Sequence, residues 1–402
     1  MTARAARTSA NRQSGLNGLV LLVTDIDAPS GGIQKNSRLL LNELRKRGVA
    51  TFACVRNYHR RPKTEEIDGT IFHRSAVLGA GLAINGLLFF ASTFFWLLRN
   101  RGKYDVIHCQ QMFGPTMVAA VASFFIDKPI LTRVTAIGEL GEVKQIREMP
   151  LSRLRLRLIK RVSAWAALTS EMKRELVGLG IEPNRISVIN NSTDIPSDRA
   201  YEPRTKTRLR RELGLGTEKI GIFVGRLSDE KNLDVLIRSW NEVCANFDGA
   251  RLLILGAGGA YRNVEARLRE LVNELGLADV VQFLGHVDRA KDYVLASDVF
   301  ILPSRTEGMS NALVEALACG AAIVATDIPG NTELCLDREN ALLVPVGDVV
   351  ATAAAIEEIL TSSKLAEQLG KAARRTAEKR LSVDRMVSAY VATYQAMLAS
   401  KA

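Results

Sequence analysis

The segment SRTEGMSNALVEALAC, residues 304–319, follows a strand-like apolar run from Val299 to Leu302 and contains the start of a helix. Gly308 opens that helix, so a ligand can approach the backbone closely. The first turn of a helix presents N–H groups without intrahelical partners and a partial positive charge, which together favour an anion. The pattern therefore predicts a strand, a glycine turn and a helix whose N-terminus can hold a phosphate.

Two carboxylates accompany this helix start. Glu307 precedes Gly308, and Glu315 lies four positions after Asn311, so Asn311 and Glu315 share one face of the helix. A diphosphate bound to the amides, with ribose hydroxyls on Glu315, would suit a nucleotide sugar. The alternative is a capped surface helix on which both carboxylates are solvated.

A second strand-to-helix loop lies upstream. IGIFVG, residues 220–225, has the pattern of a short buried strand, and Arg226 and Lys231 follow it. Apolar residues then recur at helical spacing, at Leu233, Leu236, Ile237 and Trp240. Ligands of open α/β sheets bind at such loops, where two cations can neutralise a diphosphate as its bond breaks. Taken singly, each cation is more typical of a solvated surface charge.

Over about residues 17 to 375 the chain resembles the retaining, nucleotide-sugar-dependent glycosyltransferases of family 4, which have the GT-B fold. The resemblance is highly specific in the second half, where Glu307 and Glu315, with seven residues between them, match the family's signature. It implies an α/β architecture of two Rossmann-like domains whose parallel sheets face each other across a cleft. The matching segments are VGRLSDEKNLDVLI (224–237), LLILGAGG (252–259), FLGHV (283–287), ASDVFILPSRTEGMSNALVEALACGAAIVATDIPG (296–330) and ALLVPVGD (341–348).

The resemblance also implies roles for individual residues. Arg226 and Lys231 would stabilise the departing diphosphate, and Glu307 would contact the hydroxyls of the donor sugar. Glu315 would hold the ribose, and the amides of residues 308–311 would face the phosphates. The implied donor-binding residues are Gly31, Gly32, Gly256, Gly308, Met309, Ser310, Asn311 and Glu315.

The first half of the chain offers weaker candidates. His108 ends the strand-like segment YDVIHC (104–109), where the family often has a histidine, and is a candidate catalytic residue. A lone histidine at a strand end is, however, more often structural. Many relatives have another histidine in the loop where this chain has Arg133, so no histidine contact with the donor is expected there. Glu139, in the following loop, is a candidate residue on the acceptor side.

Composition limits the class of protein. With 402 residues the chain is long enough for two domains. Its five cysteines and four histidines lack metal-ligand or redox spacing, which is typical of a cytosolic protein with reduced thiols. Asp25 and Asp27 formally resemble a metal-binding DxD pair, but they follow a first strand, Leu19 to Thr24. We interpret them as loop polarity and predict no metal and no cofactor besides the nucleotide-sugar substrate.

Turn signals and the resemblance together divide the chain into four parts. Residues 1–16 form a basic, flexible tail without an apolar centre, so no signal peptide is predicted. An acceptor-side Rossmann-like domain spans residues 17–195, and a nucleotide-sugar-binding domain spans residues 196–380. The polar, proline-marked segment 190–203 is the expected linker. Residues 381–402 contain a final helix, which in the family crosses back to the N-terminal domain.

The positive charge is concentrated in the first half, where residues 1–200 have a net charge of +13, against −2 for residues 201–402. Such a balance favours an anionic partner, either lipid headgroups or an acidic acceptor, and no nucleic-acid-binding signature is present.

The uncharged segment Ser75 to Leu98 is long enough to cross a bilayer, but its glycines favour a buried or interfacial helix. Leu151 to Arg161 alternates apolar and basic residues and suits either an anionic membrane or an ordinary basic surface.

Together the resemblance and these patterns predict a retaining hexosyltransferase that uses a UDP- or GDP-sugar. The expected acceptor is a hydroxyl of a lipid-linked or envelope polysaccharide intermediate, at the inner face of the cytoplasmic membrane. Two other classes remain open: a non-catalytic protein that binds nucleotide sugars or anionic lipids, and a sugar-nucleotide epimerase with the same fold. Release of nucleotide together with acceptor-dependent sugar transfer would distinguish them.

Overall fold

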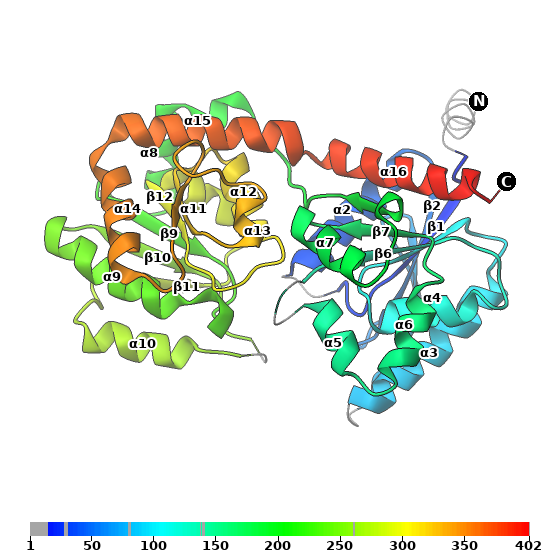
Figure 1. Ribbon diagram of the computed structural model, residues 1–402. Coiled ribbons are helices and arrows are strands. Elements are labelled where there is room, and N and C mark those ends of the chain that lie inside the picture. Colours follow the sequence, from blue (N-terminus) through cyan, green and yellow to red (C-terminus); the bar gives the residue numbers. More distant parts are fainter. Residues whose placement is uncertain are drawn as a thin grey trace. The chain divides into compact units, whose positions relative to one another are not determined.

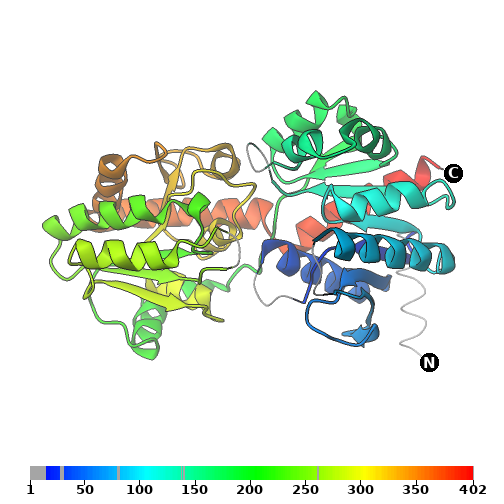
Figure 2. The same cartoon turned by 90° about the horizontal axis from the view of Figure 1, so that it is seen from below.

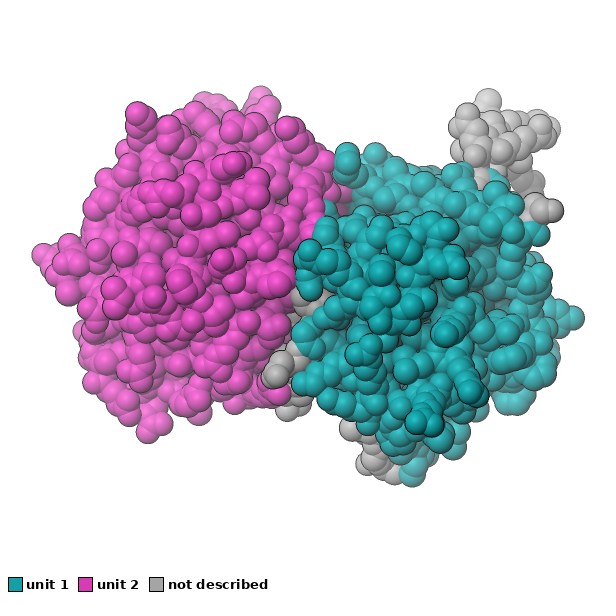
Figure 3. All heavy atoms as spheres, viewed as in Figure 1, with its two compact units in different colours: residues 1–191, 383–402 teal, residues 192–382 magenta. Residues whose placement is uncertain are grey.

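The structure is a computed structural model that describes residues 15–27, 31–78, 82–136, 138, 141–259 and 262–401. The chain divides into two compact units, coloured separately in Figure 3. Unit 1 combines residues 1–191 with the C-terminal segment Val383–Ala402, and unit 2 comprises Ser192–Ser382. The first boundary falls four residues before the predicted one, and the second falls two residues after it.

Unit 1 is built on an eight-stranded sheet in the order β3-β4-β2-β1-β5-β6-β7-β8 (Figure 1). All neighbouring strands run parallel except β3 and β4. The central strands are buried along their whole length, as expected where helices cover both faces of a parallel sheet. The strands are β1 (Gly18–Leu22), β2 (Ala50–Arg56), β3 (Thr64–Ile67), β4 (Thr70–Ser75), β5 (Val106–Cys109), β6 (Ile130–Val134), β7 (Ala164–Ala167) and β8 (Ile186–Val188).

The last helix of the chain belongs to unit 1. Met386, Tyr390 and Tyr394 of this helix, α16, are buried in the same apolar core as residues of β1 and α2. Figures 1 and 2 show α16 (red) lying along unit 1. The helices of this unit are α2 (Gly32–Lys46), α3 (Leu82–Arg99), α4 (Gly114–Ala122), α5 (Glu142–Glu148), α6 (Ser152–Ile159), α7 (Ser170–Gly178) and α16 (Val383–Ala399), with a 3-10 turn η2 (Pro183–Arg185).

The strands β3 and β4 form an antiparallel hairpin. Asp68 and Gly69 join the two strands, and both have positive φ angles, of 47° and 75°. This is the conformation of a two-residue type I′ turn, for which Asp-Gly is a favoured sequence. The Asp68-Gly69 dipeptide was therefore the signal that could have revealed β3.

Unit 2 has a six-stranded sheet in the order β11-β10-β9-β12-β13-β14, and every pair is parallel. Its strands are β9 (Ile220–Val224), β10 (Arg251–Leu255), β11 (Val281–Gly285), β12 (Val299–Leu302), β13 (Ile323–Thr326) and β14 (Leu342–Val344). Its helices are α8 (Pro203–Glu212), α9 (Leu233–Asn246), α10 (Glu265–Glu274), α11 (Ala290–Ala296), α12 (Asn311–Ala318), α13 (Pro329–Thr332), α14 (Val349–Thr361) and α15 (Ser363–Arg380), with 3-10 turns η3 (Asp198–Tyr201) and η4 (Asp229–Lys231).

Both sheets change the direction of their crossovers near the middle. In unit 1 the chain runs from β1 to β2 on one side and later returns to β5 on the other. In unit 2 it runs from β9 to β10 and returns to β12. Such a switch point leaves a crevice at the carboxyl ends of the strands, where ligands of open α/β sheets bind.

Two segments with open interpretations are helical. Leu151 to Arg161, for which strand and helix were both considered, contains α6, and Ser75 to Leu98 contains most of α3. Within the described ranges, none of the helices combines the length and the apolar character needed to cross a membrane.

Candidate functional site

The centre of the candidate site in unit 2 is an ion pair between Lys231 and Glu307. Lys231 ends the η4 turn that follows β9, and Glu307 lies in the loop between β12 and α12. Because β9 and β12 are neighbours at the switch point, the two loops meet at the same edge of the sheet. Nζ of Lys231 lies 2.5 Å from Oε1 of Glu307, and the two side chains are only 12% and 9% exposed. A cation and a carboxylate are therefore held together where a ligand is expected.

The carboxylate of Glu307 is fixed from two sides. The Ser304 hydroxyl donates a 2.7 Å hydrogen bond to the same Oε1. Gly330, in α13, packs against the backbone of Glu307, since a Cβ atom added at Gly330 would lie 2.3 Å from the Glu307 carbonyl oxygen. Sequence reasoning assigned no role to Ser304 or Gly330, although both lie inside the segment that carries the resemblance.

Arg226 follows β9 and is more open to solvent than Lys231, with 61% of its side chain exposed. Its Nη2 lies 3.1 Å from Oε1 of the buried Glu230, to which the Ser228 hydroxyl also donates at 2.7 Å. Burial alone would raise the pKa of Glu230, but the Ser228 hydroxyl, its own amide and the nearby cations lower it overall. Glu230 is thus an anionic support that orients Arg226, and sequence reasoning did not identify it.

Helix α12 begins in the loop that carries Glu307. Ser310 is its N-cap residue, and its hydroxyl accepts a hydrogen bond from the Leu313 amide. The helix therefore starts at Asn311, and Gly308, expected to open it, lies in the preceding loop. Asn311 and Glu315 are half-buried on one face of the helix, whereas the side chain of Met309 is buried.

Gly256 follows β10 in a conformation that favours glycine, with φ at 129°. A Cβ atom at this position would lie 1.8 Å from the carbonyl oxygen of Gly225, the residue before Arg226. Close packing of two backbones therefore explains the glycine without a ligand. Contact between Gly256 and a donor stays a prediction.

In unit 1, Gly31 and Gly32 lie at the beginning of α2. Gly31 is the N-cap residue, with φ at 149°, and α2 starts at Gly32. Because α2 follows β1, its first turn lies at the switch point of the unit 1 sheet. Residues 28–30 lie outside the described part of the chain, and the role of both glycines toward a donor stays a prediction.

Each half of the chain matches the model of a known protein family. The model of the family described as "Glycosyl transferases group 1" matches residues 205–376, and that of "Glycosyltransferase Family 4" matches residues 30–196. The chain belongs to the group 1 and family 4 glycosyltransferases.

Curated relatives resemble this glycosyltransferase over most of the length of the chain. D-inositol 3-phosphate glycosyltransferase of Acidothermus cellulolyticus is 32% identical over 67% of this chain, and the match spans 62% of that relative. N-acetyl-alpha-D-glucosaminyl L-malate synthase of Bacillus anthracis is 28% identical over 74% of this chain and 76% of its own length. The chain thus matches less than two thirds of the length of the inositol phosphate relative.

Solved structures show the fold. Sucrose-phosphate synthase from Thermosynechococcus elongatus has a TM-score of 0.80 at 21% identity and covers 96% of this chain and 100% of its own. Anabaena Alr3699/HepE in complex with UDP-glucose has a TM-score of 0.75 at 20% identity, with 95% and 99% covered. With its two parallel-sheet α/β units, the chain has the expected GT-B fold.

The predicted catalytic role of His108 is corrected by the structure, because its imidazole has no exposed surface with which to touch a substrate. Its Nδ1 lies 2.7 Å from the hydroxyl of Tyr394, and its ring centroid lies 5.0 Å from that of Tyr390. Burial, and then the charge of Arg133, lower the pKa of His108 to about 3, so the ring is neutral at ordinary pH. His108 therefore joins β5 to α16 inside the core of unit 1.

Arg133 is also buried. It belongs to the segment in which many relatives have a histidine. Its Nη1 donates to Oε1 of Gln110 at 2.8 Å, and its Nη2 donates to Oδ1 of Asn191. The guanidinium thereby ties the ends of β5 and β6 to the last residue of unit 1's first segment. Glu139, the acceptor-side candidate in the next loop, lies outside the described residues.

The Asp25 and Asp27 pair is engaged by basic side chains. Asp27 Oδ2 lies 3.1 Å from Nε of the buried Arg74, and Asp25 Oδ2 lies 3.6 Å from Nε2 of His59. Both carboxylates therefore face basic side chains, and the interpretation of the pair as loop polarity stays a prediction. Over the described ranges, no set of three or more His, Cys, Asp or Glu side chains is arranged to hold a metal ion.

Proposed function

We propose that the chain transfers a sugar from a nucleotide diphosphate donor, a UDP- or GDP-sugar, to a hydroxyl group and retains the configuration at the anomeric carbon. The bond from that carbon to the diphosphate oxygen breaks, a bond to the acceptor oxygen forms, and the acceptor hydroxyl loses its proton. The observation that carries this proposal is the nearly buried Lys231–Glu307 pair at the β9 and β12 switch point, in the loop that leads into α12.

Lys231 and Arg226 would act on the leaving group. The diphosphate gains negative charge as the bond to the sugar breaks, and both cations belong to the loop between β9 and α9. Because Lys231 is almost inaccessible to water, its charge is weakly screened, and a fixed cation stabilises a developing anion better than mobile solvent does. The amides at the start of α12 would add N–H donors to the phosphates. This scheme requires no metal ion.

Glu307 would bind the sugar itself. Within the described residues, Oε1 is the carboxylate oxygen with hydrogen-bond partners, namely Lys231 and Ser304. Oε2 therefore remains available to accept hydrogen bonds from hydroxyls of the donor sugar. Glu315, half-buried on α12, would accept hydrogen bonds from the ribose.

The comparisons support a nucleotide-sugar donor and a hydroxyl acceptor. One structural neighbour is described in complex with UDP-glucose, and the curated relatives are named for transfer to inositol 3-phosphate and for a malate conjugate. For this chain we propose a lipid-linked or envelope polysaccharide intermediate as the acceptor, because the surface of unit 1 combines exposed apolar residues with basic ones.

One part of this surface is α3. No charged residue occurs between Leu82 and Leu98, yet Ile84, Leu87 and Phe95 are exposed, the last two at 69% and 66%. A soluble surface helix normally directs charged residues to solvent. An exposed apolar face of this kind is typical of a surface that contacts a membrane or a partner.

The second part adds basic residues to apolar ones. The rings of Phe94 in α3 and Phe125, after α4, are 5.7 Å apart, and Arg161 lies 4.0 Å above the exposed ring of Phe124. Helix α6 packs on α4 and exposes Leu154 between basic residues. The basic residues of this segment are Arg153, Arg155, Arg157, Lys160 and Arg161. We therefore propose peripheral attachment to the inner face of the cytoplasmic membrane.

The test of the proposed function is a panel of UDP- and GDP-sugars. A donor that binds only the folded protein must raise its melting temperature. With a lipid-linked monosaccharide present, the same donor should release nucleoside diphosphate and yield a glycoside with the donor's anomeric configuration, read by NMR. Donor binding without turnover would instead indicate a non-catalytic binding protein, and conversion of the donor sugar to its epimer would indicate an epimerase.

A further inference from the structure

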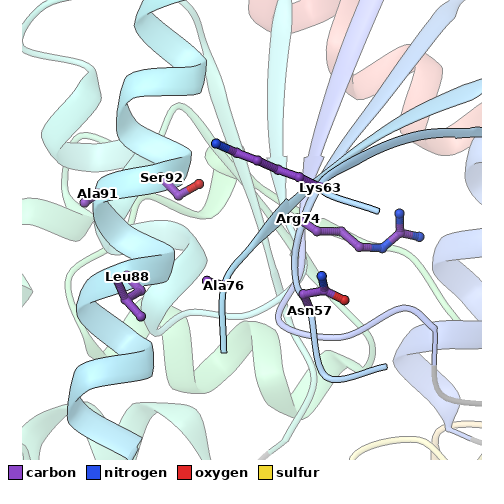
Figure 4. A pocket seen from close by; sticks show the side chains of 7 residues that line it. All are labelled: Asn57, Lys63, Arg74, Ala76, Leu88, Ala91 and Ser92. Carbon is purple, nitrogen blue, oxygen red and sulfur yellow. The ribbon is translucent and has the colours of Figure 1, made fainter. Parts of the chain in front are cut away.

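A cavity of about 330 Å³ lies beside α3 in unit 1 (Figure 4). Its walls come from the segments after β2 and before β3, from β4 with its following residue, and from the middle of α3. The lining residues are Asn57, Lys63, Arg74, Ala76, Leu88, Ala91 and Ser92. Its volume is within the range of about 300 to 1,000 Å³ that is usual for small-molecule sites.

The cavity is placed where this sheet is expected to bind ligands. Asn57 directly follows β2, and Ala76 directly follows β4, so both mark the carboxyl ends of parallel strands. Ligands of open α/β sheets bind beyond these ends. This cavity is therefore on the functional edge of the unit 1 sheet.

Two cations line the cavity, and they differ in their partners. Arg74 turns its guanidinium away from α3 in Figure 4, and it pairs with Asp27 at 3.1 Å and with Glu65 at 2.8 Å. Lys63 extends toward α3 and Ser92, and no carboxylate of the described residues forms an ion pair with it. Burial, and then the charge of Lys63, lower the pKa of His73, which is hydrogen-bonded to Ser92. Lys63 thus supplies an uncompensated positive charge at this end of the cavity.

Helix α3 gives the cavity an apolar wall. Ile84, Leu88, Ala91 and Phe95 follow the helical repeat and share one face. Leu88 and Ala91 line the cavity, whereas Ile84 and Phe95, at the two ends of this face, are exposed. One apolar stripe of α3 therefore passes through the cavity and reaches the protein surface on both sides.

We propose that this cavity binds a phosphorylated amphiphile, with its phosphate on Lys63 and its hydrocarbon chain along the apolar stripe of α3. The inference rests on the proposed function, because such a ligand would be the lipid-linked acceptor of the transfer reaction. Lys63, unpaired among the described residues, selects an anion, and the stripe selects a chain that extends beyond the cavity. A free phosphate would satisfy only the first of these features, and a neutral lipid only the second.

The test measures binding to the full chain by calorimetry, with decyl phosphate below its micelle concentration as the probe, so that no membrane surface is present. Inorganic phosphate and decyl glucoside are the comparison ligands. We expect saturable binding of decyl phosphate, at least about tenfold tighter than either comparison ligand. Lys63→Ala should weaken it by about tenfold or more, the usual effect of losing a charged hydrogen-bond donor. Ala76→Trp should block it by filling the cavity from an exposed position.

Lys103→Ala is the matched control, because Lys103 is an exposed lysine elsewhere in unit 1. It should bind decyl phosphate as the unmodified chain does. Equal affinity of Lys63→Ala and the unmodified chain would overturn the proposal, as would equal binding of inorganic phosphate or of decyl glucoside. Melting shifts with UDP- and GDP-sugars on the same samples separate the two hypotheses. A chain that binds donor but not decyl phosphate contradicts the cavity assignment alone, whereas loss of all donor binding and turnover contradicts the proposed function.

Discussion

In unit 2 the carboxyl edge of the sheet carries Lys231 paired with Glu307, and Arg226 stands open to solvent beside them. In unit 1 the same edge carries Arg74 and Arg133, which are both buried within the unit. They bind residues of neighbouring segments, and the uncharged helix α3 packs on β4, the strand that carries Arg74. Two sheets of the same kind thus place their charges in different surroundings.

The difference teaches that the loops, and not the sheets, distinguish the two units. Both sheets are parallel around a switch point, so both offer a crevice at the carboxyl ends of their strands. A nearly buried ion pair with the exposed Arg226 in the same loop suits a charged, soluble ligand such as a nucleotide sugar. A basic unit with an apolar helix surface suits an amphiphilic ligand or a membrane. The following predictions test this contrast, from the largest expected effect to the smallest.

Replacing Lys231 with Ala should lower turnover by roughly 10²-fold or more, as is typical when one electrostatic contact to a transition state is removed. The fold should survive, because Lys231 lies in a loop between β9 and α9. Arg226→Ala should show an effect in the same direction. Lys364→Ala, at an exposed lysine of the same unit, is the control and should keep normal turnover. Normal turnover in both site variants would remove unit 2 as the donor site.

Gly330→Ala should lower turnover by about 10-fold to 10²-fold, since a shift of about 1 Å in a catalytic group can have this effect. The added Cβ must displace the backbone of Glu307, with which it would collide. Gly178→Ala in α7 is the control, because nothing lies within 4 Å of its Cβ position. If the two variants retain equal activity, the position of Glu307 does not depend on Gly330.

Unit 1 should bind vesicles that contain anionic lipid and bind neutral vesicles weakly. Each Lys or Arg near an anionic surface contributes about 1 kcal/mol, and salt screens this part. Charge reversal at Arg153, Arg155 and Arg157 should therefore weaken binding at low salt. Replacing Leu87 and Phe95 with Ser should remove the part that resists high salt.

Vesicle co-sedimentation over a series of salt concentrations measures both parts of the binding. Donor affinity, measured by melting shifts, should stay constant in all these variants, because the substituted residues belong to unit 1. Recovery of the unmodified chain in the supernatant with anionic vesicles at low salt would disprove peripheral attachment.

His108 should make stability depend on pH. Its pKa is about 3 in the folded chain, against an ordinary value of 6.5, so the unfolded chain binds a proton that the folded chain does not. The contribution of His108 to the free energy of unfolding is fully present above pH 6.5. It declines as the pH falls from 6.5 toward 3. His108→Gln should flatten the dependence of the unfolding free energy on pH in this window. An unchanged slope, measured by urea unfolding, would contradict the buried, neutral histidine.

Removal of divalent metal should have the smallest effect. The proposed leaving-group stabilisation relies on Lys231, Arg226 and helix amides. Transfer activity should therefore persist in excess chelator, measured with the same donor and acceptor. Activity that disappears and returns with Mg²⁺ or Mn²⁺ would instead point to a metal-dependent reaction.

Much of the second half could be predicted from local patterns. The strand β12, the helix α12 and the strand β9 follow from apolar runs, a glycine turn and helical spacing within a few residues. These signals depend on neighbours along the chain, so they are readable without a structure. The Asp68-Gly69 turn belongs to the same class, although the short strand β3 before it carries two glutamates instead of apolar residues.

Contacts between distant residues were decided by the tertiary structure. Lys231 and Glu307 are 76 positions apart, and only the adjacency of β9 and β12 brings Nζ and the carboxylate together. His108 and Tyr394 are 286 positions apart, and the return of α16 to unit 1 converts a candidate catalytic histidine into a buried one. By itself, the sequence determined which chemical groups lie near strand ends. Packing of distant segments determined which of these groups water and ligands can reach, because burial depends on what covers a side chain.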